Sequence, residues 1–232
     1  MSAASARTGT DNTRVPSTSG RGGSLTDAYL LLYNGACAVG WNLTLYKIGG
    51  AFLEGGDVRD DYVAALQLVS TLELVHAFVG LVKSNPMNVF MQVLGRDLAL
   101  FAVVTAFPPV RDSPWVLLMF TAWATSEVIR YPFYALNIAG VCPPMLQWLR
   151  YSAFILLYPL GFVGELGTWI VGLPHIKAVG LPGVPGFPEG SSIYVLYAYI
   201  VFAFAIGAPK LYMHMLRQRK KQLQGGGKVK AW

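Results

Sequence analysis

Two side chains in the apolar stretch from Leu146 to Gly172 have the types and the spacing that acid–base chemistry requires. Tyr158 and Glu165 are seven residues apart, and seven helical steps of 100° return to within about 20° of the same direction. On a helix, the phenol and the carboxyl therefore share one face. Glu165 has no basic side chain within one helical turn, and its surroundings are apolar. A carboxyl group in such a setting can hold a proton near neutral pH, as an acid–base catalyst does. The alternative is a protonated, structural Glu165 that bonds to a neighbouring helix.

The residues around this pair predict a bent, narrow helix. Pro159 removes a backbone donor and clashes with the preceding turn. The segment has no side chain at three positions, which are Gly161, Gly164 and Gly167. These positions form either a groove or a close contact with another helix. Such a segment could hold an acyl chain with its reactive centre between the phenol and the carboxyl. Two turns are about 10 Å of rise, so the bend and the side-chain reach must close the gap.

The composition predicts that these residues belong to a membrane protein. Of the 232 residues, 54% are hydrophobic and only 13% are charged, whereas a soluble domain carries about a quarter charged residues. Lys and Arg outnumber Asp and Glu by 18 to 12, but seven of the bases lie between Lys210 and Lys230. A basic end of this kind is typical of the cytosolic terminus of a membrane protein. We therefore expect no nucleic-acid partner.

Six stretches are long and apolar enough to cross the hydrocarbon layer, which takes about 20 residues. They are 28–46, 62–82, 87–107, 115–139, 146–172 and 193–216. Their length and lack of alternation exclude barrel strands. The sequence predicts an all-α bundle of about six transmembrane helices over residues 26–216. Residues 1–25 are expected to be a disordered tail and residues 217–232 a basic tail.

The basic residues outside these stretches predict the orientation. An even number of crossings places both termini on one side, and that side carries most of the bases, so both termini are expected to be cytosolic. Lys228 and Lys230 stand five and three residues from the C-terminus. This is the form of a dilysine retrieval signal for the endoplasmic reticulum, which is read only in the cytosol.

Charged side chains at membrane depth are costly, at least about 2.5–3.5 kcal/mol each. The simplest interpretation is that they pair and hold the bundle together. We expect the acids to pair with the bases, and only Glu165 to lack a partner. The acids are Glu73, Asp97 and Glu127, and the bases are Arg96, Arg130 and Arg150.

Several blocks of sequence match one family. The fifth stretch contains Leu149-Arg150-Tyr151 and the run from Leu157 through Tyr158-Pro159 and Gly161 to Gly164-Glu165. Further blocks are Leu72-Glu73 with His76, Thr125-Ser126-Glu127-Val128-Ile129-Arg130-Tyr131, and Tyr212-Met213-His214-Met215. Across about residues 25–223 the chain closely resembles the 3-hydroxyacyl-CoA dehydratases of microsomal fatty-acid elongation, also named protein tyrosine phosphatase-like proteins.

The resemblance implies a multi-pass enzyme of the endoplasmic reticulum. Its reaction removes water from a (3R)-3-hydroxyacyl-CoA to give the trans-2-enoyl-CoA, the third step of each elongation cycle. The implied catalytic pair is Tyr158 and Glu165, in a cavity that opens to the cytosol, and which of the two is the base stays open. Candidate supporting or substrate-contacting residues are Arg150, Tyr151, Arg130, Glu127, Gly161 and Gly164.

The resemblance also implies the partners. No metal or organic cofactor is expected. The expected partners are the acyl-CoA substrate, membrane lipid, and three elongase components: a condensing enzyme, a 3-ketoacyl-CoA reductase and an enoyl-CoA reductase.

Three other functions fit the sequence less well. A catalytically silent scaffold of the elongase complex is disfavoured because both Tyr158 and Glu165 are present. A small transporter is disfavoured because the sequence shows no internal repeat. A cysteine phosphatase requires an arginine six positions after its cysteine, but Trp148 follows Cys142 and Leu43 follows Cys37 at that distance. The sequence therefore excludes phosphatase activity of that type.

Overall fold

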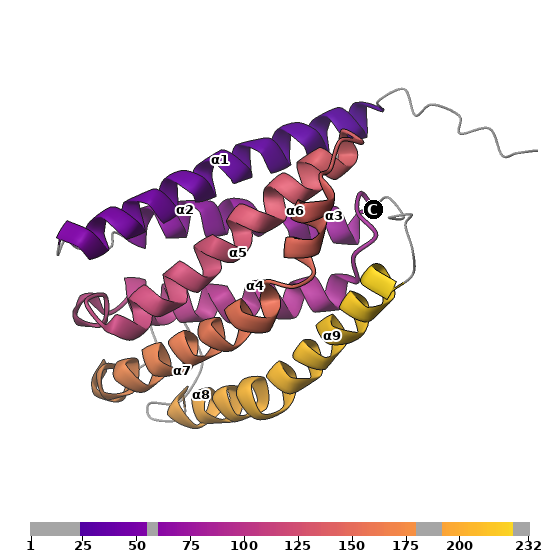
Figure 1. The fold of residues 1–232 in the computed structure, drawn as a ribbon. Coiled ribbons are helices and arrows are strands. Elements are labelled where there is room, and N and C mark those ends of the chain that lie inside the picture. Colours follow the sequence, from indigo (N-terminus) through magenta and orange to yellow (C-terminus); the bar gives the residue numbers. More distant parts are fainter. Residues whose placement is uncertain (1–23, 55–59, 180–191, 225–232) are drawn as a thin grey trace, which may run out of the picture.

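The computed structural model describes residues 24–54, 60–179 and 192–224, and within these ranges every regular element is a helix (Figure 1). The predicted all-α class is confirmed. Most of the predicted tail 1–25 lies outside the described residues, as do Lys228 and Lys230. The last helix continues to Gln224, so the first part of the predicted basic tail is helical.

Each of the six predicted stretches corresponds to one helical unit. The first is α1 (Leu25–Glu54), and the second is α2 (Asp60–Ser70) with α3 (Leu72–Phe78). The third is α4 (Pro86–Ala99), which continues as the π-helix η1 (Leu100–Thr105) and is followed by η2 (Pro108–Val110). The fourth is α5 (Pro114–Ile138), and the fifth is α6 (Pro144–Arg150) with α7 (Phe154–Val179). The sixth is α8 (Ser192–Val201), the π-helix η3 (Phe202–Gly207) and α9 (Ala208–Gln224).

Local turn chemistry sets several of these boundaries. Asn85 caps α4, because its side chain accepts a hydrogen bond from the backbone N–H of Met87 at 2.9 Å. Ser113 caps α5 in the same way, with 3.4 Å to the N–H of Trp115. A proline follows each cap at the first helical position, where a missing N–H costs nothing. These two caps and the prolines that follow them fix where α4 and α5 begin.

Three of the described stretches have the length and the apolar composition of a membrane span. They are Pro86–Thr105, Pro144–Val179 and Tyr197–Lys220, which correspond to the third, fifth and sixth predicted crossings. Over residues 24–54, 60–179 and 192–224, the structure is thus all-helical with three candidate membrane-spanning helices.

Helix α5 lies at the centre of the arrangement. It packs along α1 on one side and along α7 on the other, and α8 and α9 run beside α7 (Figure 1). Fully buried side chains of α1, α5 and α7 form the core between them, among them Trp41, Phe120 and Trp169. Helix α1 begins and α9 ends at the same end of the bundle (Figure 1).

Helices α5 and α7 approach so closely because α7 carries glycine at the contact. A Cβ added to Gly164 would lie 2.6 Å from the backbone nitrogen of Met119 and 2.8 Å from its Cα. Backbone atoms cannot turn aside as the end of a side chain can. Gly161 has ordinary room, with its added Cβ 3.8 Å from Ala122 and 3.9 Å from Trp123. Of the two predicted alternatives, a groove or a close helix contact, the structure shows the close contact.

We predict that Gly164→Ala lowers the free energy of unfolding by about 2 kcal/mol, because the new methyl group overpacks the α5–α7 contact. The measurement is thermal and denaturant unfolding of the protein in detergent. The matched control is Gly35→Ala in α1, where no atom lies within 4 Å of the added Cβ. That change should stabilise the helix slightly, and an equal loss at both positions would contradict the close-contact assignment.

Candidate active site

A network of buried charges joins three helices. Glu127 of α5 is only 1% exposed, and its two carboxylate oxygens accept hydrogen bonds from Arg96 of α4 and from Nε of Arg130, the latter at 2.6 Å. A buried carboxylate is tolerated only when it is paired and hydrogen-bonded. Glu127 meets this requirement with two arginines, so it ties α4 to α5.

Arg130 extends the network to α3. Its two terminal nitrogens bind the two oxygens of Glu73 at 2.6 and 2.7 Å, which is a bidentate pair. The hydroxyl of Tyr131 donates a third hydrogen bond to Glu73 at 2.6 Å. The predicted structural pairing is therefore confirmed for two acids and two bases: Glu73, Glu127, Arg96 and Arg130.

The predicted pairing is wrong for Asp97 and Arg150. Asp97 accepts hydrogen bonds from Gln67 at 3.0 Å and from Thr71 at 3.5 Å, so polar groups of the α2–α3 region replace an arginine. Arg150 binds the hydroxyl of Tyr134 at 3.2 Å, and no carboxylate of the described residues forms an ion pair with it. The sequence gives the depth of each charge along its helix but not the rotation of that helix.

We predict that Glu127→Gln lowers the free energy of unfolding by about 3–5 kcal/mol, because it removes the buried negative charge that the two partly buried arginines share. Chemical denaturation in detergent measures this loss. Glu54→Gln, at the exposed end of α1, is the matched control and should change the stability by less than about 0.5 kcal/mol. A small effect at both positions would show that the network does not stabilise the bundle.

Glu165 has a partner that its own helix does not supply. Nε1–H of Trp123 on α5 donates a hydrogen bond of 3.0 Å to Oε1 of Glu165. The guanidinium of Arg96 lies 5.1 Å from the ring of Trp123. Within the described residues Glu165 therefore forms no ion pair, as expected, but a neutral donor on the neighbouring helix holds its carboxyl group. The second oxygen, Oε2, forms no hydrogen bond within the described residues.

Tyr158 faces a different helix. The α7 helix continues through Pro159, and the Tyr158 hydroxyl lies 3.5 Å from the carbonyl oxygen of Ala208 in α9. Its ring stacks on Tyr212 of α9 with the centroids 5.7 Å apart. The phenol is thus held by α9 whereas the carboxyl of Glu165 is held by α5.

The phenol of Tyr158 and the carboxyl of Glu165 do not share a hydrogen bond in the described structure. The ring of Phe162 lies on the turn between them, 4.5 Å from the Tyr158 ring and 5.3 Å from the Phe204 ring of η3. The face that was predicted to hold a reactive centre therefore also carries an aromatic side chain, which packs on Tyr158 and Phe204.

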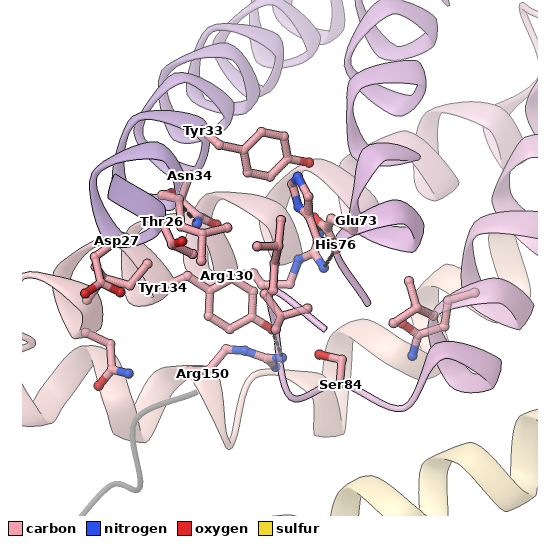
Figure 2. A pocket seen from close by; sticks show the side chains of 17 residues that line it. Thr26, Asp27, Tyr33, Asn34, Glu73, His76, Ser84, Arg130, Tyr134 and Arg150 are labelled. Atoms are coloured by element: carbon pink, nitrogen blue, oxygen red, sulfur yellow. Dashed lines mark hydrogen bonds and ion pairs between the residues drawn. The ribbon is translucent and has the colours of Figure 1, made fainter. Parts of the chain in front are cut away.

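A cavity of about 290 Å³ lies at the end of the bundle where α1 begins (Figure 2). We call it the Arg150 cavity. Its wall is built by the first turns of α1, by α3 and the turn after it, by α4, by the last turns of α5 and by Arg150 of α6. Charged and aromatic groups that face it are Asp27, Tyr33, Glu73, His76, Arg130, Tyr134 and Arg150. Neither Tyr158 nor Glu165 lines it, so within the described residues this is not the cavity predicted for the pair.

The remaining predicted residues are distributed around these features. Arg130 and Arg150 line the cavity, and Glu127 holds Arg130 in place. Tyr151 is buried in the turn between α6 and α7, where its ring lies 5.8 Å from that of Phe133 and its hydroxyl has no hydrogen-bond partner within the described residues. Among all the residues that the structure describes, no group of three His, Cys, Asp or Glu side chains is placed to hold a metal ion.

Two residues that contact the predicted site were missed from the sequence, Trp123 and Tyr134. A signal for both exists, because Trp123 precedes Glu127 by four residues and Tyr134 follows Arg130 by four. Residues four apart lie on the same face of a helix. The buried charges of α5 thus mark the face that also carries these two aromatic side chains.

Comparison with known proteins identifies the family. The family model "Protein tyrosine phosphatase-like protein, PTPLA" matches residues 67–225. The chain belongs to this family. No solved structure gives a significant match.

Curated relatives from animals and plants cover most of the chain. The Arabidopsis thaliana very-long-chain (3R)-3-hydroxyacyl-CoA dehydratase PASTICCINO 2 is 36% identical over 84% of this chain and 92% of the relative. Very-long-chain (3R)-3-hydroxyacyl-CoA dehydratase 1 from Mus musculus is 32% identical over 88% of this chain and 75% of the relative. Very-long-chain (3R)-3-hydroxyacyl-CoA dehydratase 2 from Homo sapiens is 31% identical over 86% of this chain and 82% of the relative. The resemblance predicted from the sequence blocks is therefore confirmed.

Proposed function

We propose that this chain is a membrane-bound lyase that converts (3R)-3-hydroxyacyl-CoA to trans-2-enoyl-CoA, the dehydration step of very-long-chain fatty-acid elongation. The relatives that cover most of the chain carry the name of this activity. The single structural observation that supports it best is the carboxyl of Glu165. One of its oxygens is held by Trp123 and the other has no hydrogen-bond partner within the described residues.

The reaction requires a base and an acid but no redox change. A base removes the proton on the carbon next to the thioester, and the electrons of that C–H bond form the double bond. The C–O bond to the hydroxyl breaks at the same time, and an acid supplies the proton that makes the leaving group water. Glu165 as the base and Tyr158 as the acid is one assignment. The reverse, or Tyr158 polarising the thioester carbonyl, satisfies the same balance.

The hydrogen bond from Trp123 suits either assignment. An N–H donor fixes the orientation of the carboxyl group and stabilises its negative charge when the proton leaves. Because Trp123 occupies Oε1, the free Oε2 is the oxygen available to exchange a proton with the substrate. Trp123 is thus a positioning residue rather than a catalytic one.

The substrate must reach the face of α7 between the two groups. Tyr158 and Glu165 are separated by about 10 Å along the helix axis, and Phe162 lies on the turn of α7 between these two positions, with its ring 4.5 Å from the ring of Tyr158. We infer that this ring turns aside when the acyl chain enters. The neighbouring side chains of η3 and α8, such as Phe204 and Tyr199, then offer an apolar surface to the chain.

For the topology, we propose six membrane crossings, one for each helical unit, in the endoplasmic reticulum with both termini cytosolic. Three of these units qualify as spans by length and composition, and α1 begins at the end of the bundle where α9 finishes (Figure 1). Acyl-CoA substrate, membrane lipid and the condensing, ketoreductase and enoyl reductase components of the elongase are the proposed partners.

We predict that Tyr158→Phe and Glu165→Gln each reduce the formation of enoyl-CoA from a long-chain 3-hydroxyacyl-CoA by at least about 100-fold, the usual contribution of a general acid or base. Purified protein in detergent, assayed by mass spectrometry, provides the measurement. Both variants should unfold at the wild-type temperature. Tyr46→Phe, at an exposed position of α1, is the control and should keep full activity.

The same assay separates the catalytic proposal from the scaffold. Turnover that survives both substitutions would reject the pair as catalytic residues. A well-folded wild-type protein that forms no enoyl-CoA from substrates of any chain length would favour the scaffold.

We predict that Trp123→Phe lowers kcat by about 10-fold or more, because the removed N–H is a charge-assisted donor to the reacting carboxyl. KM should stay within about twofold, since Trp123 orients Glu165 rather than binding substrate. The matched control is Trp41→Phe, because Nε1 of this buried tryptophan has no partner within the described residues. Equal effects of the two changes, or a rise in KM alone, would contradict the positioning role.

A further inference from the structure

Arg150 takes no part in the ion-pair network that joins Glu73, Arg96, Glu127 and Arg130. Its Nη2 binds the Tyr134 hydroxyl at 3.2 Å, and its Nε is buried without a hydrogen-bond partner in the described part of the chain. An unpaired, partly buried guanidinium is costly, and its planar set of donors matches a phosphate group. Because Arg150 lines the Arg150 cavity (Figure 2), an anion in this cavity would complete its interactions.

The other charged groups of the cavity already have partners. Glu73 is bound by Arg130 and Tyr131. Asp27 accepts a hydrogen bond from the backbone N–H of Ser24 at 3.3 Å, in the first turn of α1. His76 is hydrogen-bonded to Tyr29 at 2.8 Å. The two carboxylates in the wall are therefore engaged, and Arg150 is the group with donors to spare.

Positions along α5 give the distance between this cavity and Glu165. Tyr134, which holds Arg150, and Trp123, which holds Glu165, are eleven residues apart on α5. Eleven residues correspond to about 16 Å along the helix axis. In an acyl-CoA, the extended pantetheine arm separates the thioester from the phosphates by a distance of this order. This separation matches the length of the arm, but the ion pairs of Glu127 occupy the face of α5 between the two positions, so a substrate that contacts both Arg150 and Glu165 must pass beside that network.

We propose that the Arg150 cavity binds the phosphate-bearing end of the CoA group while the acyl thioester reaches Glu165 along α5. This inference rests on the proposed function, because it takes acyl-CoA as the substrate. A cavity of about 290 Å³ has the size of a small-ligand pocket, so it holds part of the CoA group and leaves the rest outside. Arg150 then contributes to substrate affinity and not to the chemical step.

The first experiment measures CoA binding without turnover. The full 232-residue chain is placed in phosphatidylcholine nanodiscs, and the binding of radiolabelled CoA is measured by equilibrium dialysis. Arg150→Gln should weaken CoA binding by about tenfold or more, since it removes charge-assisted hydrogen bonds. Arg217→Gln removes a charge from the exposed side of α9 and, as the matched control, should change binding by less than about twofold. Equal binding by wild type and Arg150→Gln would overturn the proposal.

Two further variants guard against misfolding of Arg150→Gln. Arg150→Lys keeps the charge and should retain part of the CoA affinity. Tyr134→Phe keeps Arg150 but frees its guanidinium, and should weaken CoA binding by a smaller factor than Arg150→Gln. If Arg150→Gln does not fold, wild-type CoA affinity in both of these variants would overturn the proposal.

The second experiment compares two thioesters of the same 3-hydroxyacyl group, one with CoA and one with pantetheine, which lacks the phosphates. Arg150→Gln should raise KM for the CoA thioester with little change in kcat, and should not affect turnover of the pantetheine thioester. Equal losses with both substrates would assign Arg150 a structural role and overturn the proposal. Arg150-dependent CoA binding without formation of enoyl-CoA would instead reject the proposed dehydration and leave the CoA site in place.

Membrane phospholipid is the other source of phosphate. The dialysis is therefore repeated in nanodiscs that contain phosphatidic acid. Unchanged CoA affinity supports the assignment to CoA. An affinity that falls in the wild type but not in Arg150→Gln would show that the lipid phosphate occupies the Arg150 cavity, which contradicts the proposal.

Discussion

The position of α5 depends on one carboxylate, that of Glu127, which lies between two arginines in an apolar helical bundle. A buried charge of this kind is stable only while both of its partners stay in place. Arg96 fixes α5 to α4, and Arg130 passes the constraint on to Glu73 in α3. The network therefore sets both the rotation of α5 and its height in the bundle. These are the two quantities that decide where the aromatic side chains of α5 point.

The consequences extend in both directions along α5. Towards its N-terminus, Trp123 reaches Glu165 because Gly164 lets α7 come close. Towards its C-terminus, Tyr134 holds Arg150 at the cavity. Tyr158 is independent of α5, since its contacts are with α9. The two proposed catalytic groups are thus held by different helices, and a shift of α9 relative to α5 would change the distance between them.

Much of this fold follows from the sequence alone. The six helical units agree with the six apolar stretches, because apolar length is a local property of the chain. The pairing of Glu127 with arginines was also predictable, since a charge at this depth requires a partner. The partners of Asp97, Arg150 and Glu165 were not, because they depend on how helices far apart in sequence rotate against each other. Local neighbours showed that Glu165 has no base on its own helix but could not show Trp123 on the next one.

We propose that Glu165 and Tyr158 act together on a thioester whose CoA end lies at Arg150. This proposal is tested most directly by a cryo-electron microscopy structure of the Glu165→Gln variant with bound long-chain (3R)-3-hydroxyacyl-CoA. We predict that the hydroxyl-bearing carbon lies between the side chains of residues 158 and 165, with Phe162 turned aside and the CoA phosphates beside Arg150. A substrate bound with its hydroxyl away from both side chains, on another face of the bundle, would contradict the account.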